Sequence, residues 1–234
     1  MTDNVIRVLD KGFVRLVDKM GGDLSISRAA RVSYDAAWRA GKDQGSDNRL
    51  INYLWKNKHT SPFEAVTLTF EIRAPIFVFR QWHRHRTWSY NEISARYAEL
   101  PADFYVPDPS LIGSQSSSNK QMREIAEMDE PERMKRDVQL DMYERTCHAA
   151  FEQYKFLIEE GWPRELARMC LPVSTYSHMF ATTNLLNLMR FLTLRIHEHA
   201  QYEIRVYAEA METLASHVAP EAMKAWRSNL DQGI

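Results

Sequence analysis

The chain has little glycine, little cysteine and no long hydrophobic run. Its 234 residues include 8 Gly and 2 Cys, and neither a G-x-G-x-x-G nor a G-x-x-x-x-G-K-[ST] motif occurs. A phosphate of any bound cofactor must therefore be held by side chains rather than by a glycine-rich loop. Cys147 and Cys170 form neither a C-x-x-C pair nor a metal quartet, which excludes a disulfide framework and a zinc module. We expect a protein of the reducing cytoplasm.

Neither sign of charge is in excess. Lys and Arg total 30 and Asp and Glu total 31, so the formal net charge is -1. Proteins that bind nucleic acid by bulk electrostatics carry excess positive charge, so any basic site here must be local. The longest apolar run, residues 74–79, is far short of the ~20 residues of a membrane span. Residues 1–4 lack the pattern of a signal peptide. We expect no nucleic-acid partner and no membrane.

The hydrophobic pattern predicts an α+β fold. Residues 66–73 alternate apolar and polar side chains, which is typical of a strand buried on one face. From residue 135 a 3-4 spacing of apolar side chains that includes Cys147 predicts a long helix ended by Gly161. Because strands precede helices, we expect a mostly antiparallel sheet packed with helices, and a helical C-terminal half, in a single domain of residues 1–234. The other predicted strands are 5–9 and 13–20; the other predicted helices are 25–34, 48–56, one opened by Pro75, one from Pro163 to before Pro172, 182–195 and 199–217.

Two segments stand out by composition. Residues 108–131 are rich in Ser, Asn, Gln, Glu and Lys, which predicts a polar, mobile insertion without an assigned function. Residues 80–97 contain four arginines and two histidines interleaved with Trp and Tyr. A solvated basic face is the ordinary explanation of such a cluster, but aromatic side chains are poor choices for an exposed loop. Guanidinium pairs two phosphate oxygens at a time, and Arg80 and Arg84, four residues apart, are predicted to share a helix face, with Arg86 off it. The segment therefore predicts a phosphate site.

Other chemistry for this region has weaker support. The H-x-H pairs at 83–85 and 197–199 suggest metal ligation, but no Cys or carboxylate completes either pair at ligand spacing. Alternate residues of a helix also point in different directions, so we predict no metal site. Ser94 and Glu92 resemble a nucleophile and a base, yet no G-x-S-x-G motif accompanies them.

The same segment carries a family resemblance. Arg84-His85-Arg86 followed by seven residues and Ser94 resembles the RHR-x7-S signature of the flavin-dependent thymidylate synthases. The match continues through Ser89-Tyr90-Asn91-Glu92 and Arg96-Tyr97. Further segments resemble the family in the same order: Ala29-Ala30-Arg31-Val32-Ser33, His59-x-Ser61-Pro62-Phe63-Glu64, Pro163-Arg164-Glu165-x-Ala167-Arg168, Leu171-Pro172, Leu194-Arg195 and His199-Ala200-Gln201.

The resemblance implies an activity and an assembly. Family members are α+β homotetramers whose active sites are shared between subunits. They convert dUMP to dTMP with 5,10-methylenetetrahydrofolate as carbon donor, FAD as redox cofactor and NADPH as reductant. They use no cysteine nucleophile, which agrees with Cys147 on a core stripe and Cys170 in an apolar setting, both expected to be structural.

The resemblance also implies roles for single residues. Arg195 is the expected catalytic residue, because addition to the uracil ring develops negative charge on N3 and O4, which a fixed cation stabilises. Ser94 is assigned to nucleotide binding, since no base accompanies its hydroxyl. His59 and His199 are candidate folate or flavin contacts. The implied dUMP contacts are Gln81, Trp82, His83, Arg84, Glu92, Ile93, Ser94, Ala95, Arg96, Arg168 and Arg195; the implied FAD contacts are Ser61, Arg84, His85, Arg86, Glu92, Asn184 and Arg190.

The spacing of residues predicts two further local features, and this sequence departs from the family pattern at two positions. Asn184, Asn187 and Arg195 are predicted to form a polar line along one helix, and residues 61–64 are predicted to form a capping box. Leu186 stands where a polar or basic flavin contact is common, and Arg190 where Asn or His is common. Two other functions stay open at this point: a nucleotide- or RNA-binding module, and a degenerate relative that only oxidises NADPH.

Overall fold

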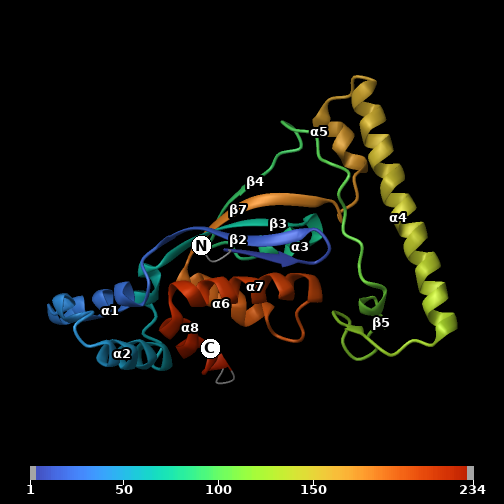
Figure 1. Ribbon diagram of the computed structural model, residues 1–234. Coiled ribbons are helices and arrows are strands. Elements are labelled where there is room, and N and C mark those ends of the chain that lie inside the picture. The colour runs from blue at the N-terminus through green and yellow to red at the C-terminus, as the bar shows by residue number, and fades with distance from the viewer. Residues whose placement is uncertain (1–3, 231–234) are drawn as a thin grey trace.

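The computed structural model describes residues 4–230, so most of the N-terminal segment considered above lies outside the described residues. A five-stranded sheet of order β1-β2-β3-β7-β4 forms the centre, and every neighbouring pair is antiparallel. Helices α6 and α7 lie against one face of this sheet (Figure 1). The predicted α+β class, with a helical C-terminal region in a single domain, is confirmed. The strands are β1 (Val5–Val8), β2 (Gly12–Met20), β3 (Thr67–Pro75), β4 (Ser89–Glu92), β5 (Ser114–Gln115), β6 (Arg123–Glu124) and β7 (Tyr176–Asn184).

Strand β3 is the middle of the sheet, as its alternating sequence predicts. Leu68, Phe70 and Ile72 are fully buried on the face that packs against the helices. Burial of each such side chain contributes about 1.5–3 kcal/mol relative to exposure. The helices are α1 (Asp23–Arg31), α2 (Gln44–Lys56), α3 (Ile76–Trp82), α4 (Glu130–Glu159), α5 (Arg164–Ala167), α6 (Leu185–Arg195), α7 (Tyr202–Val218) and α8 (Pro220–Arg227).

The sequence patterns missed two strands of the central sheet. Strand β7 pairs with β3 along its whole length, from Tyr176 opposite Pro75 to Asn184 opposite Thr67. The helix predicted from Thr182 therefore begins only at Leu185. Strand β4 is four residues long and pairs with β7 from within the basic segment. Both strands depend on partners distant in sequence, so no local pattern shows them.

Capping explains the shifted helix boundaries. Helix α2 begins at Gln44 instead of residue 48 because the Asp43 carboxylate accepts from the Ser46 N–H at 3.0 Å. Helix α4 begins at Glu130 instead of 135 because Asp129 and Glu132 form a capping box.

Other predicted helix ends were also wrong. Helix α1 ends at Arg31, and a 3-10 turn continues to Tyr34. The predicted capping box of residues 61–64 is wrong, since a 3-10 turn there starts after Thr60 without a side-chain cap. Helix α7 starts at Tyr202 rather than 199, and α8, which Pro220 opens, was not predicted.

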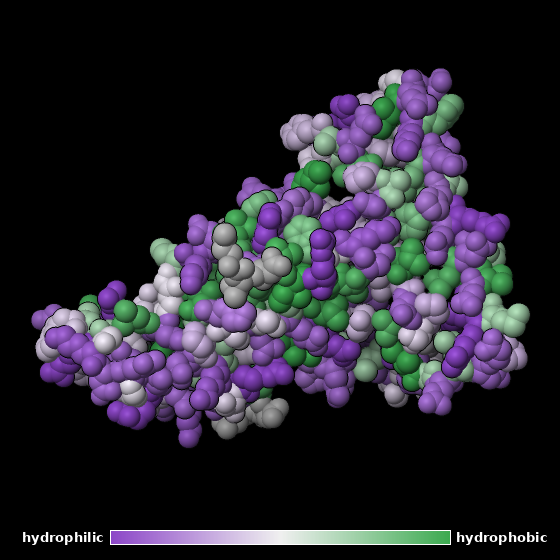
Figure 2. Space-filling view, in the orientation of Figure 1, coloured by the Kyte–Doolittle hydropathy of each residue, from purple (hydrophilic) through white to green (hydrophobic). Residues whose placement is uncertain are grey.

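Helix α4 forms an arm that stands beside the sheet, with α5 at its far end (Figure 1). The arm has a small core of its own around Phe104, Cys147, Phe151 and Tyr154. Cys147 is 3% exposed, as expected for a structural residue. Hydrophilic side chains predominate at the ends of the molecule formed by α1 and α2 and by the arm, whereas hydrophobic ones gather between the two ends (Figure 2). The arm also exposes hydrophobic side chains, among them Met142 and Phe156. Within residues 4–230, no helix is both long and apolar enough to pass through a bilayer.

The segment predicted as a polar, mobile insertion carries a small hairpin. Strands β5 and β6 pair with each other, and Gly113 precedes them with a φ of +61°. A Cβ at Gly113 would lie 2.5 Å from the Glu124 carbonyl oxygen, so the close approach of the two strands requires glycine.

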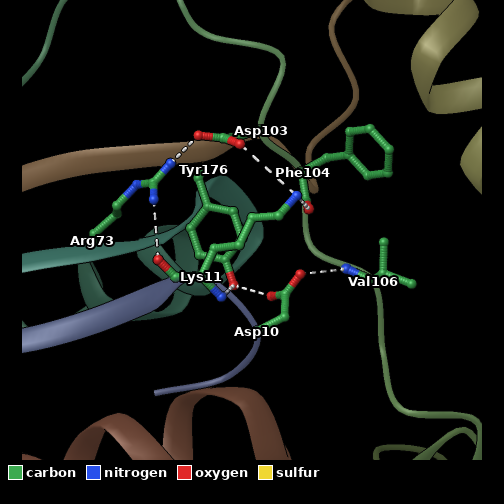
Figure 3. A network of polar contacts seen from close by, with 7 residues as sticks. All are labelled: Asp10, Lys11, Arg73, Asp103, Phe104, Val106 and Tyr176. Carbon is green, nitrogen blue, oxygen red and sulfur yellow. Dashed lines mark hydrogen bonds and ion pairs between the residues drawn. The ribbon is translucent and has the colours of Figure 1, made fainter. Parts of the chain in front are cut away.

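A polar network attaches the loop before this hairpin to the end of the sheet. Arg73 on β3 pairs with Asp103 and donates to the Lys11 carbonyl oxygen at 3.1 Å. The Tyr176 hydroxyl on β7 donates to one carboxylate oxygen of Asp10. The other Asp10 oxygen accepts from the backbone N–H of Val106. These bonds fix the backbone on both sides of Tyr105. Figure 3 shows the members of the network: Asp10, Lys11, Arg73, Asp103, Phe104, Val106 and Tyr176.

Candidate active site

Arg195, the last residue of α6, is held along one edge of its guanidinium. Its Nε donates to His85 Nε2 at 3.0 Å and its Nη2 donates to the Gln81 carbonyl oxygen at 3.2 Å. Neither bond uses Nη1, so this nitrogen can meet a ligand. Burial lowers the pKa of Arg195 from its ordinary value, but a guanidinium stays charged in proteins. The site therefore offers a fixed, half-buried cation.

His85 holds that cation as a neutral ring. It lies in the loop after α3 and packs edge-on against Phe191, with ring centroids 4.8 Å apart. Burial, and then the nearby charge of Arg195, lowers the pKa of His85 to about 4. At neutral pH the ring is uncharged, so Nε2 accepts from Arg195 and the proton resides on Nδ1. The pair can thus form without repulsion between two cations.

Two glutamines connect Arg195 to a buried carboxylate. The Gln81 side chain donates to Oε1 of Gln201, and Gln201 Nε2 donates to Glu203 Oε2 at 2.8 Å. Glu203 is 2% exposed and pairs with Arg123 of β6 at 3.0 Å. Sequence reasoning missed Glu203 and Arg123. A charged residue on the apolar face of α7 was the available signal for Glu203, whereas nothing in the polar insertion distinguished Arg123.

A second group of predicted residues lies at the arm. Arg96 Nε is 3.5 Å from a carboxylate oxygen of Glu165 on α5, and the Arg96 N–H donates to Ser94 Oγ at 3.3 Å. Arg168 follows α5 and donates to the Glu165 carbonyl oxygen at 3.3 Å. Figure 1 shows α5 on the far side of the sheet from α6 and α7. A single chain therefore does not bring Arg168 and Arg195 together.

The arginines of the RHR motif are exposed. Arg84 and Arg86 follow the end of α3 at Trp82, so the prediction that Arg80 and Arg84 share a helix face is wrong. Within the described part of the chain, no carboxylate forms an ion pair with Arg84 or Arg86. Cations without a protein partner suit an anionic ligand such as a diphosphate.

Several predicted side chains have structural roles. Trp82 is fully buried and stacks on Phe191 with centroids 4.9 Å apart, and the Ala95 side chain is also buried. Asn184 precedes α6 as its cap, and its Oδ1 accepts from the Asn187 N–H at 2.9 Å. The predicted polar line therefore does not begin inside the helix.

The remaining predicted residues are mostly near the surface. Arg190 is exposed, with Nη1 3.4 Å from Asn187 Oδ1. The departure at Leu186 fits the fold, because this side chain is 3% exposed and belongs to the core. The Ser177 hydroxyl donates to Glu92 Oε1 at 2.5 Å. His59, Ser61 and Ile93 are exposed and His83 is half-buried.

His199 faces a cavity between the insertion and the start of α7. The cavity has a volume of about 510 Å³ and is lined in part by Arg123, Gln201 and Arg205. His199 packs edge-on against His197, with ring centroids 4.6 Å apart. Over residues 4–230, no three His, Cys, Asp or Glu side chains gather in a way that would hold a metal ion.

Known proteins resemble this chain over nearly its full length. The sequence profile of the Thy1 family, described as thymidylate synthase complementing protein, matches residues 15–221. The chain belongs to this family. The chain is similar to the flavin-dependent thymidylate synthase of Treponema pallidum (strain Nichols), with 46% identity over 99% of this chain and 74% of that protein's length. The corresponding enzyme of Thermus thermophilus is 44% identical over 97% of this chain and 80% of its own.

A solved structure agrees with the family. The UMP/dUMP methylase PolB from Streptomyces cacaoi, bound with 5-Br dUMP, superposes with a TM-score of 0.82 and 40% identity. The match covers 95% of this chain and 97% of PolB. The resemblance read from the RHR motif is thus confirmed: the chain is a flavin-dependent thymidylate synthase by family, which makes it a methyltransferase and a flavoprotein of dTMP biosynthesis.

Proposed function

We propose that this chain converts dUMP to dTMP, using 5,10-methylenetetrahydrofolate as carbon donor and FAD that NADPH reduces. The observation that carries the proposal is the fixed Arg195 guanidinium with Nη1 free, in a family member whose structural relative PolB binds 5-Br dUMP. Addition to the uracil ring develops negative charge on N3 and O4. A cation held in place before the reaction stabilises that charge without reorganisation.

The other residues bind and orient. His85 and the Gln81 carbonyl accept hydrogen bonds from Arg195 Nε and Nη2, so Arg195 Nη1 is left to contact the pyrimidine. Neither cysteine is placed as a nucleophile: Cys147 is buried, and the Cys170 thiol lies within hydrogen-bonding distance of the Ala167 and Ala150 carbonyl oxygens, at 3.2 and 3.5 Å. The proposed reaction therefore uses no cysteine nucleophile.

FAD, when bound, supplies the hydride that reduces the transferred carbon. Arg84 and Arg86 suit its diphosphate because both are exposed and neither has a carboxylate partner among residues 4–230. His85 and Asn184 already use Nε2 and Oδ1 within the chain, so they would contact the cofactor through His85 Nδ1 and Asn184 Nδ2. We assign the other flavin contacts to Ser61, Glu92 and Arg190, and a folate or flavin contact to His59 and His199.

We further propose a homotetramer whose sites are shared between subunits. Support comes from the separation of the dUMP contacts into two groups, one around Arg195 and one around Arg168 at the arm. A site with both groups needs Arg168 from a second subunit. Mixing inactive Arg168→Ala and Arg195→Ala proteins should restore dTMP formation by forming sites with both arginines intact. A chain that stays inactive on mixing and elutes as a monomer would contradict this assembly.

We also propose a cellular location and a domain range for this protein. Both cysteines are free thiols, which supports a place in the cytoplasm. We assign residues 1–234 to one thymidylate synthase domain that acts on a mononucleotide, without a nucleic-acid or membrane partner.

Spectroscopy and product analysis test the reaction. The purified protein should be yellow, and its flavin absorbance should bleach anaerobically when NADPH is added. Formation of dTMP should require dUMP and the folate together. A colourless protein that FAD cannot reconstitute would overturn the proposal and favour a nucleotide-binding module. NADPH oxidation without dTMP would identify a degenerate relative.

A further inference from the structure

Glu203 is a buried carboxylate that receives hydrogen bonds from three residues. Both terminal nitrogens of Arg123 donate to its Oε1 at 3.0 Å, and the Tyr105 hydroxyl donates to the same oxygen at 3.3 Å. Gln201 Nε2 donates to the other oxygen at 2.8 Å. A buried carboxylate needs such donors, and Arg123 also supplies the opposite charge. The counter-ion of Glu203 thus comes from the insertion.

The Glu203 carboxylate sets the orientation of the Gln201 side-chain amide, which in turn sets that of the Gln81 side-chain amide. A carboxylate only accepts hydrogen bonds, so Gln201 must face Glu203 with its NH₂ group and turn Oε1 toward Gln81. Gln81 in turn must donate through Nε2, as the structure shows. Its own Oε1 and its second N–H are then left for a ligand. The backbone of the same Gln81 holds Arg195.

The chain that leads into the insertion is anchored to the sheet. The network of Figure 3 anchors the chain on both sides of Tyr105, because Lys11 Nζ donates to the Phe104 carbonyl oxygen and Asp10 accepts from the Val106 N–H. Arg123 also lies over the Tyr202 ring, 5.6 Å from its centroid, at the start of α7. Arg123 thus contacts the start of α7 at two residues, Tyr202 and Glu203.

We propose that Arg123 is a positioning residue for the nucleotide site. By holding Glu203, it orients Gln201 and then Gln81, and thereby sets how tightly dUMP binds. The proposal rests on the proposed function, in which Gln81 contacts dUMP. Arg123 acts through other residues and does not itself touch the nucleotide.

The first experiment replaces Arg123 by an uncharged side chain of similar length. Arg123→Met should raise the KM and Kd for dUMP about tenfold, the effect of one lost hydrogen bond of about 1.4 kcal/mol, while kcat stays within about threefold. FAD content should not change. Arg133→Met is the matched control, because the Arg133 side chain donates to the Met128 carbonyl oxygen and, among residues 4–230, has no hydrogen bond that leads to Glu203. Equal dUMP affinity in wild type and Arg123→Met would overturn the proposal.

A second variant breaks the connection without touching the ion pair. Gln201 is exposed, so Gln201→Leu leaves the core and the Arg123–Glu203 pair in place. It should weaken dUMP binding to the same extent as Arg123→Met. The thermal midpoint should fall because a buried Glu203 oxygen loses one donor, but the protein should stay folded. Unchanged binding in a folded Gln201→Leu protein would refute the connection even if Arg123→Met does not fold.

A double-mutant cycle separates the relay from the proposed function. If Arg123 acts through Gln81, then Arg123→Met should add no further loss of dUMP affinity to Gln81→Ala. Additive losses would overturn the relay while leaving Gln81 as a dUMP contact. A wild-type protein that binds no dUMP would instead overturn the proposed function itself.

Discussion

Replacing Arg195 by alanine tests the electrostatic role of this side chain directly. The change removes the guanidinium that His85 and the Gln81 carbonyl hold in place. Nothing else in the described part of α6 can replace it, because the nearest arginine of that helix, Arg190, is exposed and lies next to Asn187. Arg195→Ala should therefore leave the flavin bound and abolish most turnover.

The size of the effect follows from burial. Two unit charges 4 Å apart interact by about 4 kcal/mol near a protein surface and by about 1 kcal/mol in bulk water. The difference, about 3 kcal/mol, is what the half-buried Arg195 offers beyond solvent, and loss of one preorganised donor typically lowers kcat about 10²–10³-fold. We expect a loss in that range. Arg195→Lys should lose less, because it keeps the charge but not the two-point anchorage.

The assay is single-turnover dTMP formation with flavin already reduced, so that NADPH binding does not contribute. Arg145→Ala is the control, because Arg145 is a surface arginine of α4 paired with Asp141. Flavin absorbance and dUMP titration establish that both ligands still bind. If Arg195→Ala bound both ligands and kept its single-turnover rate within threefold of wild type, the proposed role of this cation would be wrong.

Three further predictions concern nucleotide binding, pH and stability. Ser94→Ala should weaken dUMP binding but keep measurable turnover; an inactive variant with unchanged dUMP affinity would make Ser94 part of the chemistry. His85 has a pKa lowered to about 4 in the fold against about 6.5 when unfolded. The unfolded chain therefore binds more protons in that window, and the free energy of unfolding should fall as pH drops from about 6.5 to about 4. Urea titrations at several pH values should show a smaller slope for His85→Gln, and equal slopes would count against the assignment. Asp47 is 6% exposed and pairs with Arg31, so Asp47→Ala should lower the free energy of unfolding by about 3–5 kcal/mol. Urea denaturation measures this loss, with Asp43→Ala, which removes an exposed helix cap, as a milder comparison.

Local patterns predicted those elements whose stability is visible within a short window. Strand β3 alternates because one face meets the helices, and α4 shows a 3-4 stripe because one side of it meets the arm core. Strands β4 and β7 escaped prediction because each becomes a strand only by pairing with a distant segment. Residues 176–184 mix polar and apolar side chains without a regular alternation.

In the candidate active site, too, the sequence predicted some features and only the tertiary structure showed the others. The family resemblance located His85 in the RHR motif and Arg195 in the Leu194-Arg195 segment, and the structure joins them by a hydrogen bond between residues 110 positions apart. No pattern indicated that the counter-ion of Glu203 would come from the insertion, because this pairing exists only when the hairpin lies against α7. No sequence pattern indicated either that Arg168, which follows α5, and Arg195, which ends α6, lie far from each other within one chain (Figure 1).

By itself, the sequence determined the family, the α+β class and the kinds of side chain that meet an anion, because these depend on residue type and short spacings. The tertiary structure alone decided which of these side chains share a surface. It made His85 a neutral partner of Arg195, since only folding buries that ring beside a cation. It also turned Arg123 of an ordinary polar segment into the counter-ion of Glu203, since the low exposure of a carboxylate is a property of packing and not of sequence.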